Sequence, residues 1–258
     1  MTLASLSGQH ALVTGASRGI GAVVAAALAA EGAHVSLLAR EAQSLARLAG
    51  QLGNDRALAV AADVTDGASV RGAFAAARAR FGPVHILINN AGQAASAKFT
   101  DTDEALWQRI MAVNLTGTYL CAHAAVTDML ELKYGRIVNI ASTAGLRGAA
   151  YISAYVASKH AVIGLTRALA LEYATRNITV NAVCPGYVDT DIVRQAVATI
   201  RHKTGRSESE ALAALVATNP QQRLITPEEV ANAVLWLCRP GSQSITGQSL
   251  IISGGEVT

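Results

Sequence analysis

Short runs of β-forming residues alternate with longer helical stretches along almost the whole chain. Runs such as Ile86-Leu87-Ile88 are apolar at consecutive positions, which is typical of a strand covered on both faces. This alternation predicts an α/β fold in which a doubly wound parallel β-sheet carries helices on both faces. The seven predicted strands are 10–13, 34–38, 57–61, 85–88, 136–140, 179–183 and 249–252, and the first three predicted helices are 20–31, 41–52 and 69–81.

The length of 258 residues suits one α/β domain. One stretch, Tyr187–Ile225, breaks the alternation, is longer than a typical connection and is expected to contain two helices. Long insertions near the ends of parallel strands often cover a ligand. We therefore expect a single domain over residues 1–258, with 187–225 as a substrate-lid insertion.

Three predicted helix starts have the spacing of a capping box, in which a short polar residue is followed three residues later by Glu. Pro227 also suits the first turn of a helix. The three pairs are Asp101 with Glu104, Ser207 with Glu210, and Thr226 with Glu229.

The composition excludes several classes of protein. With 51% apolar and 15% charged residues, the chain has too much apolar surface to stay disordered. Aromatic residues make up only 4%, which argues against a surface that stacks single-stranded nucleic acid. The 21 basic and 18 acidic residues give a net charge of +3 without a basic stripe, so we expect no nucleic-acid partner.

Cysteine and histidine usage indicates neither disulfides nor a metal site. Cys121, Cys184 and Cys238 are scattered and form no C-x-x-C, and the six His residues show no ligand spacing. Residues 1–9 lack the basic start and apolar run of a signal peptide. The most apolar run, 22–30, is far shorter than the roughly 20 residues that span a bilayer. We expect a cytoplasmic protein without membrane association.

A glycine-rich loop with the spacing G-x-x-x-G-x-G lies between the first predicted strand and the first predicted helix. Glycines at this place let the backbone turn tightly and approach a pyrophosphate, and the helix N-terminus favours its negative charge. An ordinary glycine turn is the alternative, but the flanking strand and helix favour a dinucleotide site. The predicted loop contacts are Gly15, Ser17, Arg18, Gly19, Ile20 and Gly21.

The end of the second strand indicates which cofactor is used. Many dinucleotide folds place Asp or Glu there to bind the ribose 2′-hydroxyl, but this chain has Ala39 followed by Arg40. Arg18 lies where it could face the same ribose. Two guanidinium groups without a carboxylate suit a 2′-phosphate, so we predict NADPH, with NAD less favoured. The alternative is that both arginines are solvated surface residues.

Two further strand ends are candidates for the adenosine half of the cofactor. Asp63 and Val64 follow the third strand, where a side chain could hydrogen-bond an adenine. Asn90, Ala91 and Gly92 follow the fourth, where small residues let the backbone lie against the cofactor. Asn90, like the preceding Asn, could instead satisfy loop backbone groups, and both roles can hold at once.

Tyr155 and Lys159 are four residues apart, so on a helix they share one face. A neighbouring ammonium stabilises a phenolate, and a Tyr tuned in this way can donate a proton to a carbonyl oxygen or remove one from an alcohol. A surface Tyr–Lys pair is the commoner explanation of the spacing alone. Tyr151 is a rival for the proton-transfer role, but it has no Lys four residues on.

Two polar residues strengthen this assignment. Ser142 follows the fifth predicted strand, at the edge where such sheets place active sites. Asn114 stands in an apolar stretch of a helix predicted to begin near Asp103, where a buried amide needs a partner. Satisfaction by backbone groups is the alternative for Asn114.

Taken in this order, the motifs resemble the short-chain dehydrogenase/reductase family over nearly all of residues 8–255. The resemblance implies a Rossmann fold and a tetrad of Tyr155 as general acid/base, Lys159 binding the nicotinamide ribose and lowering the Tyr155 pKa, Ser142 bonding the substrate oxygen, and Asn114 helping to hold a relay water. It also implies that Pro185, Gly186, Val188 and Thr190 wrap the nicotinamide end, without any metal.

Within the family, the segments 135–143 and 181–188 resemble 3-oxoacyl-thioester reductases, including polyketide ketoreductases. Apolar residues of the insertion would suit an acyl chain or simply pack the insertion. Its basic residues could meet coenzyme A phosphates or an acidic carrier protein, although a solvated basic loop is favoured. These residues are Ala196, Val197, Ile200, Leu212, Leu215 and Val216, and Arg194, Arg201, His202, Lys203 and Arg206.

Three functions remain open. The first is NADPH-dependent reduction of a 3-oxoacyl thioester or related ketone, and the second is oxidation of a hydroxyacyl thioester or secondary alcohol. The third is a dinucleotide-binding sensor without turnover, which the complete tetrad argues against. The resemblance also implies a homotetramer.

Overall fold

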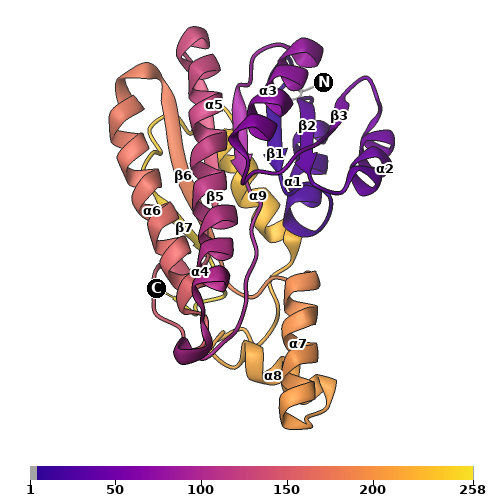
Figure 1. Cartoon of the computed structure of the whole chain (residues 1–258). Helices are drawn as coiled ribbons and strands as arrows, with labels where there is room; N and C mark the ends of the chain where they lie inside the picture. The colour runs from indigo at the N-terminus through magenta and orange to yellow at the C-terminus, as the bar shows by residue number, and fades with distance from the viewer. Residues whose placement is uncertain (1–4, 258) are drawn as a thin grey trace.

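A seven-stranded parallel sheet forms the centre of the protein (Figure 1). The computed structural model describes residues 5–257, so expectations for residues 1–4 and 258 lie outside it. The strand order β3-β2-β1-β4-β5-β6-β7 confirms the predicted doubly wound sheet. The strands are β1 (His10–Thr14), β2 (His34–Ala39), β3 (Ala57–Ala61), β4 (Ile86–Asn89), β5 (Gly135–Ile140), β6 (Ile178–Pro185) and β7 (Ser249–Ile252).

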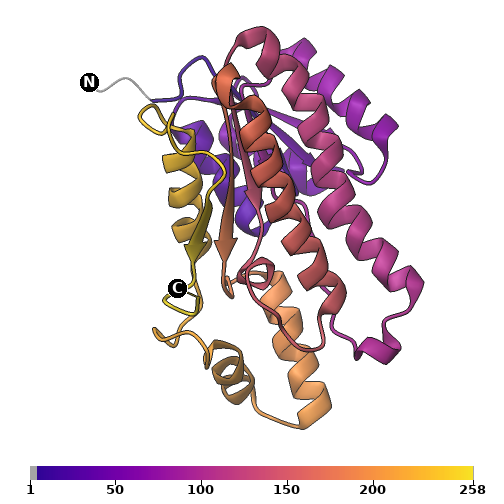
Figure 2. The ribbon, with the colours of Figure 1, turned by 90° about the vertical axis from the view of Figure 1, so that its left-hand side faces the viewer.

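Helices cover both faces of the sheet (Figures 1 and 2). Val13 of β1 packs with helices α1, α2 and α9 on one face, whereas its neighbour Leu12 packs with α3 and α5 on the other. Because successive strand residues point to opposite faces, this double burial explains the consecutive apolar runs. The helices are α1 (Gly19–Ala30), α2 (Ala42–Leu52), α3 (Gly67–Phe81), α4 (Glu104–Met111), α5 (Gly117–Leu132), α6 (Ser153–Tyr173), α7 (Asp191–Thr204), α8 (Glu208–Val216) and α9 (Pro227–Cys238).

Two of the three predicted capping boxes are present. Ser207 caps α8 and Thr226 caps α9, each with the reciprocal bond from Glu. The prediction for Asp101 was wrong, because that residue lies in a 3-10 turn over Phe99–Asp101. Helix α4 instead begins after Asp103, whose carboxylate accepts from the backbone N–H of Leu106 at 2.7 Å. Asp103, which lies two residues after Asp101 and has the same side chain, therefore caps the helix.

The stretch 187–225 forms two helices, α7 and α8, beyond the carboxyl ends of the strands (Figure 2). Its two ends are joined by a parallel bridge between Val188 and Ile225. Val197, Ile200, Leu212 and neighbouring apolar side chains form a small core inside the insertion. Packing of the insertion therefore accounts for several of the apolar residues considered above for an acyl chain.

The stretch Glu104–Leu132, which holds α4 and α5, is long and apolar enough to cross a bilayer by length and composition alone. The most apolar run of the sequence, 22–30, lies outside this stretch. Cys121, Ala125 and Met129 of α5 are buried in the core against the sheet. This packing is that of a core helix, so the stretch gives no support to a membrane span.

His10 is buried at the amino-terminal edge of the sheet, opposite the edge where the glycine loop lies. Its side chain is 1% exposed, with Nδ1 2.8 Å from the carbonyl oxygen of Gly82 and Nε2 2.9 Å from Oγ of Ser36. Burial lowers the pKa of His10 to about 4, since a desolvated imidazolium is unfavourable.

We expect the free energy of unfolding to fall by about 3 kcal/mol as the pH is lowered from 6.5 to 4. The unfolded chain binds a proton near pH 6.5 and the folded chain only near pH 4, so stability is full above pH 6.5 and decreases between the two values. Urea unfolding across this range measures the effect. The His10→Gln variant should show a flatter profile, and an unchanged slope would contradict the assignment to His10.

Candidate active site

Thr14 and Asn90 hold the ends of β1 and β4 together. The hydroxyl of Thr14 accepts from the backbone N–H groups of Asn90 and Ala91, both at 3.0 Å. The amide of Asn90 donates to the carbonyl oxygens of Thr14 at 3.0 Å and Gly15 at 3.1 Å. The expected role of Asn90 in satisfying loop backbone is therefore confirmed, and it fixes the glycine loop against β4.

The glycine loop forms a cradle that only small residues allow. A Cβ on Gly15, which has φ +65°, would stand 2.8 Å from Nδ2 of Asn90, and one on Gly21 would stand 2.4 Å from the carbonyl oxygen of Gly15. Helix α1 starts here with no side-chain cap and no acidic residue in its first turn. Its first N–H groups are thus available to an anion, and the cradle fits a pyrophosphate.

Of the two arginines predicted to bind the 2′-phosphate, Arg18 lies in the glycine loop at the start of α1, and Arg40 directly follows β2. Arg18 is 72% exposed and lies 3.5 Å from Asp191 at the start of α7. Asp63 bonds the backbone N–H of Thr65 at 2.9 Å, which lowers the pKa of its carboxyl, and nearby Arg40 lowers that pKa further. Arg40 is thus next to Ala39 in the sequence, and Arg18 is near enough to Glu41, the residue after Arg40, to help lower the pKa of that carboxyl.

Lys159 and Asn114 are both buried, and each is hydrogen-bonded to protein groups beside the end of β4. Lys159 is 5% exposed and donates to the carbonyl oxygen of Ile140 at 2.7 Å, and burial lowers its pKa to about 8. Asn114 accepts from the backbone N–H of Gln93 at 2.9 Å and donates to Oγ of Ser158 at 3.0 Å. Both polar atoms of its side chain are thus engaged by protein groups, as the alternative interpretation for Asn114 anticipated.

The backbone around Asn114 is unusual. Residues Ala112–Thr116 form a π-helical turn between α4 and α5, and such turns are frequent at functional sites. Gly92 faces this turn, since a Cβ there would stand 3.4 Å from Oδ1 of Asn114 and 3.7 Å from Nζ of Lys159. The end of β4 therefore lies directly beside both side chains.

Tyr155 lies one turn before Lys159 on α6, and Nζ of Lys159 is 5.7 Å from the centre of its ring. The expectation of a lowered Tyr155 pKa was wrong for this structure. Burial raises the pKa of Tyr155, while hydrogen bonding with Ser142 partly opposes the rise. The Lys159 ammonium is directed to the carbonyl oxygen of Ile140, so desolvation of the phenolate dominates.

The segment after β6 returns to the glycine loop. Gly186 donates its N–H to the carbonyl oxygen of Ile252 at 3.0 Å, which continues the pairing of Pro185 with the same residue. Val188 is buried in the bridge to Ile225. Thr190 then reaches α1, where its methyl group lies 3.4 Å from a Cβ built on Gly19. The expected nicotinamide segment thus borders the cradle.

Not every predicted residue faces the cradle with its side chain. Val64 is 8% exposed, and its methyl carbon lies 2.8 Å from a Cβ built on Gly117 of α5. Its side chain packs in the core, so only its backbone is available to an adenine.

Sequence reasoning missed three polar residues beside the tetrad. Ser158 follows Tyr155 by three residues on α6, a spacing that places the two on one helix face and could have revealed it. Gln93 bonds Asn114 through its backbone, and Glu256 reaches the site from the far end of the sequence. No local pattern marks these last two. Among residues 5–257, no group of three or more His, Cys, Asp or Glu could hold a metal ion.

The chain is similar to known proteins in both sequence and structure. A family model described as short chain dehydrogenase matches residues 9–201. The granaticin polyketide synthase putative ketoacyl reductase 1 of Streptomyces violaceoruber is 40% identical over 252 residues, which are 95% of this chain and 92% of that protein. The 2-(S)-hydroxypropyl-CoM dehydrogenase 3 of Xanthobacter autotrophicus is 39% identical over 246 residues, 94% of each chain.

A solved structure is also similar over nearly the whole chain. The crystal structure of a variant of actinorhodin polyketide ketoreductase with NADPH superposes with a TM-score of 0.92 at 38% identity. The match covers 96% of this chain and 97% of that one.

Proposed function

The chain belongs to the short-chain dehydrogenase family, and from that membership we propose that this oxidoreductase transfers a hydride between NADPH and a ketone or its secondary alcohol. The observation that carries the proposal is the convergence of Tyr155, Lys159 and Ser142 at the carboxyl edge of the sheet, beside the glycine cradle. The similar ketoreductase structure with NADPH supports the choice of cofactor.

The residues of this chain fit the proposed cofactor in two regions. The open N-terminus of α1 and the closely packed Gly15 and Gly21 would hold the pyrophosphate. Arg18 and Arg40 would bind the 2′-phosphate. The bound cofactor supplies the hydride. Gly186, Val188 and Thr190 would lie along its nicotinamide end.

The proposed proton chemistry belongs to Tyr155. Its raised pKa keeps the hydroxyl protonated at neutral pH, which suits a donor to the oxygen of a ketone that is being reduced. Lys159, whose pKa is about 8, is mostly cationic at pH 7, and its Nζ, 5.7 Å from the centre of the Tyr155 ring, would be attracted to the phenolate that remains. Ser142 would bond the same substrate oxygen, and Asn114 would tie the π-helical turn to α6 through Ser158, the neighbour of Lys159.

Two alternatives differ in measurable ways. Oxidation of an alcohol uses the same tetrad in reverse, and one similar protein is named a dehydrogenase. A sensor would bind NADPH without turnover. Assay of a panel of β-ketoacyl thioesters, simple β-ketoesters, cyclic ketones and sugars, in both directions and with both cofactors, separates the three.

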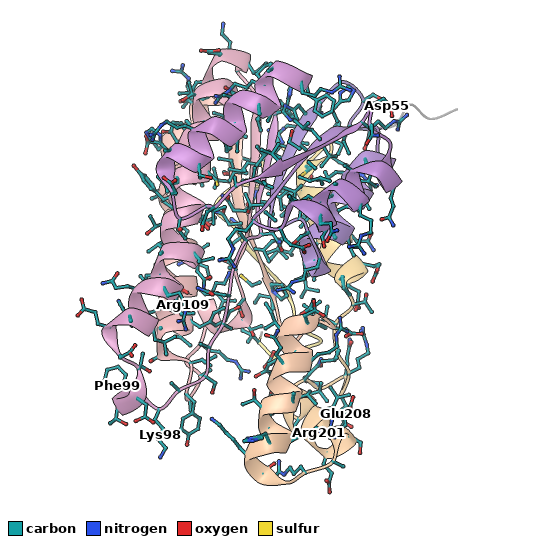
Figure 3. The ribbon with its side chains drawn as sticks, turned by 45° about the vertical axis from the view of Figure 1, so that its right-hand side comes forward. Asp55, Lys98, Phe99, Arg109, Arg201 and Glu208 are labelled. Carbon is teal, nitrogen blue, oxygen red and sulfur yellow. The ribbon has the colours of Figure 1, made fainter. Side chains whose placement is uncertain are left out.

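For the substrate class we propose a 3-oxoacyl thioester, which the similarity to a polyketide ketoacyl reductase supports. The 187–225 insertion would act as a lid, since its helices stand beyond the carboxyl edge of the sheet. Its basic surface is partly neutralised, because Arg201 pairs with Glu208 at 3.2 Å (Figure 3) and Arg194 pairs with Asp189 at 2.8 Å.

We expect that reversing the charge of Arg201 and Lys203 to Glu lowers kcat/KM on a coenzyme A thioester about tenfold, because exposed phosphates lose two positive partners. On a carrier-free β-ketoester the same variant should stay within about twofold of wild type. Steady-state assays on both substrates measure this difference. An equal fall in kcat/KM on the two substrates would show that these residues recognise neither phosphates nor a carrier protein.

We further propose a cytoplasmic homotetramer. Three buried free thiols fit a reducing compartment, and the tetramer is what the family resemblance implies. Light scattering tests the tetramer, and a monomer in solution would refute it.

A further inference from the structure

The carboxylate of Glu256 joins three segments that are far apart in the sequence. Its side chain is 2% exposed, pairs with the guanidinium of Arg147 and accepts from the hydroxyl of Thr218 at 2.9 Å. Arg147 lies in the loop that carries Ser142, and Thr218 lies where the 187–225 insertion returns to the sheet. The two segments are therefore connected through the C-terminal residues.

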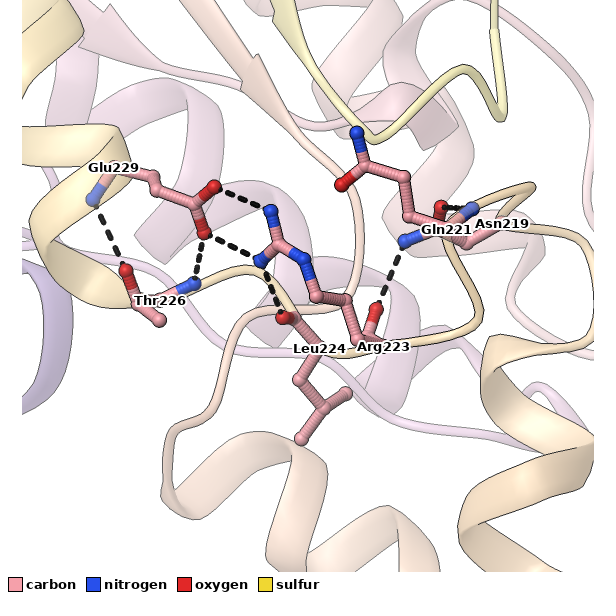
Figure 4. A network of polar contacts seen from close by, with 6 residues as sticks. All are labelled: Asn219, Gln221, Arg223, Leu224, Thr226 and Glu229. Carbon is pink, nitrogen blue, oxygen red and sulfur yellow. Dashed lines mark hydrogen bonds and ion pairs between the residues drawn. The ribbon is translucent and has the colours of Figure 1, made fainter.

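The chain before Glu256 fits closely against the same return segment. Gly254 has φ +63°, and a Cβ there would stand 2.3 Å from Oδ1 of Asn219. Asn219 is itself held in a turn, since it accepts from the N–H of Gln221 at 2.9 Å and donates to the carbonyl oxygen of Arg223 at 2.8 Å (Figure 4). The C-terminal residues therefore pack closely against the return segment, in addition to forming the ion pair with Arg147. We call this contact between Gly254, Glu256, Arg147, Thr218 and Asn219 the junction.

The junction borders the proposed active site. Oε2 of Glu256 lies 2.8 Å from a Cβ built on Gly186, in the expected nicotinamide segment. The next residue, Tyr187, is near enough to Glu256 that its pKa, already raised by burial, rises further. Tyr187 in turn contributes to the raised pKa of Tyr155.

We infer that Glu256 is a positioning residue, which fastens the return of the insertion to the Arg147 loop and so holds the substrate side of the site closed. This rests on the proposed function, in which the 187–225 insertion acts as a lid over the substrate. A buried carboxylate that loses its cationic partner is strongly disfavoured, so the junction depends first on the Arg147–Glu256 pair, and the hydrogen bond from Thr218 adds to it. None of the three touches the Tyr155 hydroxyl in the described contacts, so proton transfer itself does not depend on them.

The test compares wild-type protein with Glu256→Gln, which keeps the size of the side chain and removes its charge. We expect KM for a carrier-free β-ketoester to rise about tenfold, with kcat and the NADPH Kd within about twofold. Hydrogen–deuterium exchange should accelerate in peptides from 191–222 and 143–151 and stay unchanged in the strands. Arg223→Met is the matched control, because it removes the exposed Arg223–Glu229 pair (2.7 Å) of the neighbouring segment (Figure 4) and should alter neither readout.

Equal exchange in wild type and Glu256→Gln, or an equal loss in kcat and in 1/KM, would overturn the inference. If Glu256→Gln unfolds, Thr218→Val replaces it, since Thr218 is exposed and loses a single hydrogen bond. It should show the same changes at smaller size, and no change in exchange would again overturn the inference. A wild-type protein without turnover would instead defeat the proposed function, while the exchange comparison would still decide the role of Glu256.

Discussion

Replacing Tyr155 by Phe should lower kcat/KM for ketone reduction about 10³-fold, within the range that general acid catalysis supplies. The variant removes only the hydroxyl that would protonate the substrate oxygen. The ring of Tyr155 keeps its packing beside Lys159, so folding and NADPH binding should not change. Initial rates of NADPH consumption, together with fluorescence titration of NADPH, separate the loss of chemistry from loss of cofactor binding.

Tyr151→Phe provides the matched control. Tyr151 precedes Tyr155 by four residues and is 64% exposed. Its backbone has φ +67°, and its carbonyl oxygen accepts from the N–H of Ala97 at 2.8 Å. Loss of its hydroxyl should leave kcat/KM within about threefold, because the described hydrogen bond uses the backbone. If Tyr155→Phe retained turnover near wild type, Tyr155 would not be the proton donor.

Removing both Arg18 and Arg40 should lower kcat/KM with NADPH about 10²-fold and leave kcat/KM with NADH within about threefold. Each guanidinium would make charge-assisted hydrogen bonds to the 2′-phosphate, and losing about 3 kcal/mol in total corresponds to that factor. NADH carries no such phosphate and has nothing to lose at this position. The double variant Arg18→Ala/Arg40→Ala and the wild type are compared with both cofactors at saturating ketone.

Arg56→Ala controls for the change in net charge, since Arg56 is exposed and lies outside the cradle. It should not alter the preference for either cofactor. A parallel fall with NADPH and NADH in the double variant would mean that the arginines support the loop rather than the phosphate.

The fold was predictable because its signals are local. Runs such as Ile86-Leu87-Ile88 indicate a strand that is covered on both faces, and the glycine loop marks the turn from a strand into a helix. The repeated alternation of strands and helices indicates a parallel sheet. Helix spacing likewise placed Tyr155 beside Lys159. The cap of α4 was misplaced because Asp101 and Asp103 are equivalent as residue types, and only packing selects one of them.

The electrostatics and the long-range contacts were not predictable in the same way. The direction of the Tyr155 pKa depends on how much burial opposes the phenolate, which spacing does not encode. The burial of Val64 against Gly117 and the junction at Glu256 both join segments distant in sequence. Such contacts arise only when the sheet brings its strand ends to one edge.

The most direct test of the central claim is kcat/KM for a β-ketoester measured with NADPH and with NADH on the wild-type enzyme. The arrangement of Tyr155, Lys159, Arg18 and Arg40 predicts turnover with NADPH at least about tenfold more efficient than with NADH. Equal or greater efficiency with NADH would contradict the cofactor assignment. No turnover across the whole panel of ketones and alcohols would contradict the proposed reaction.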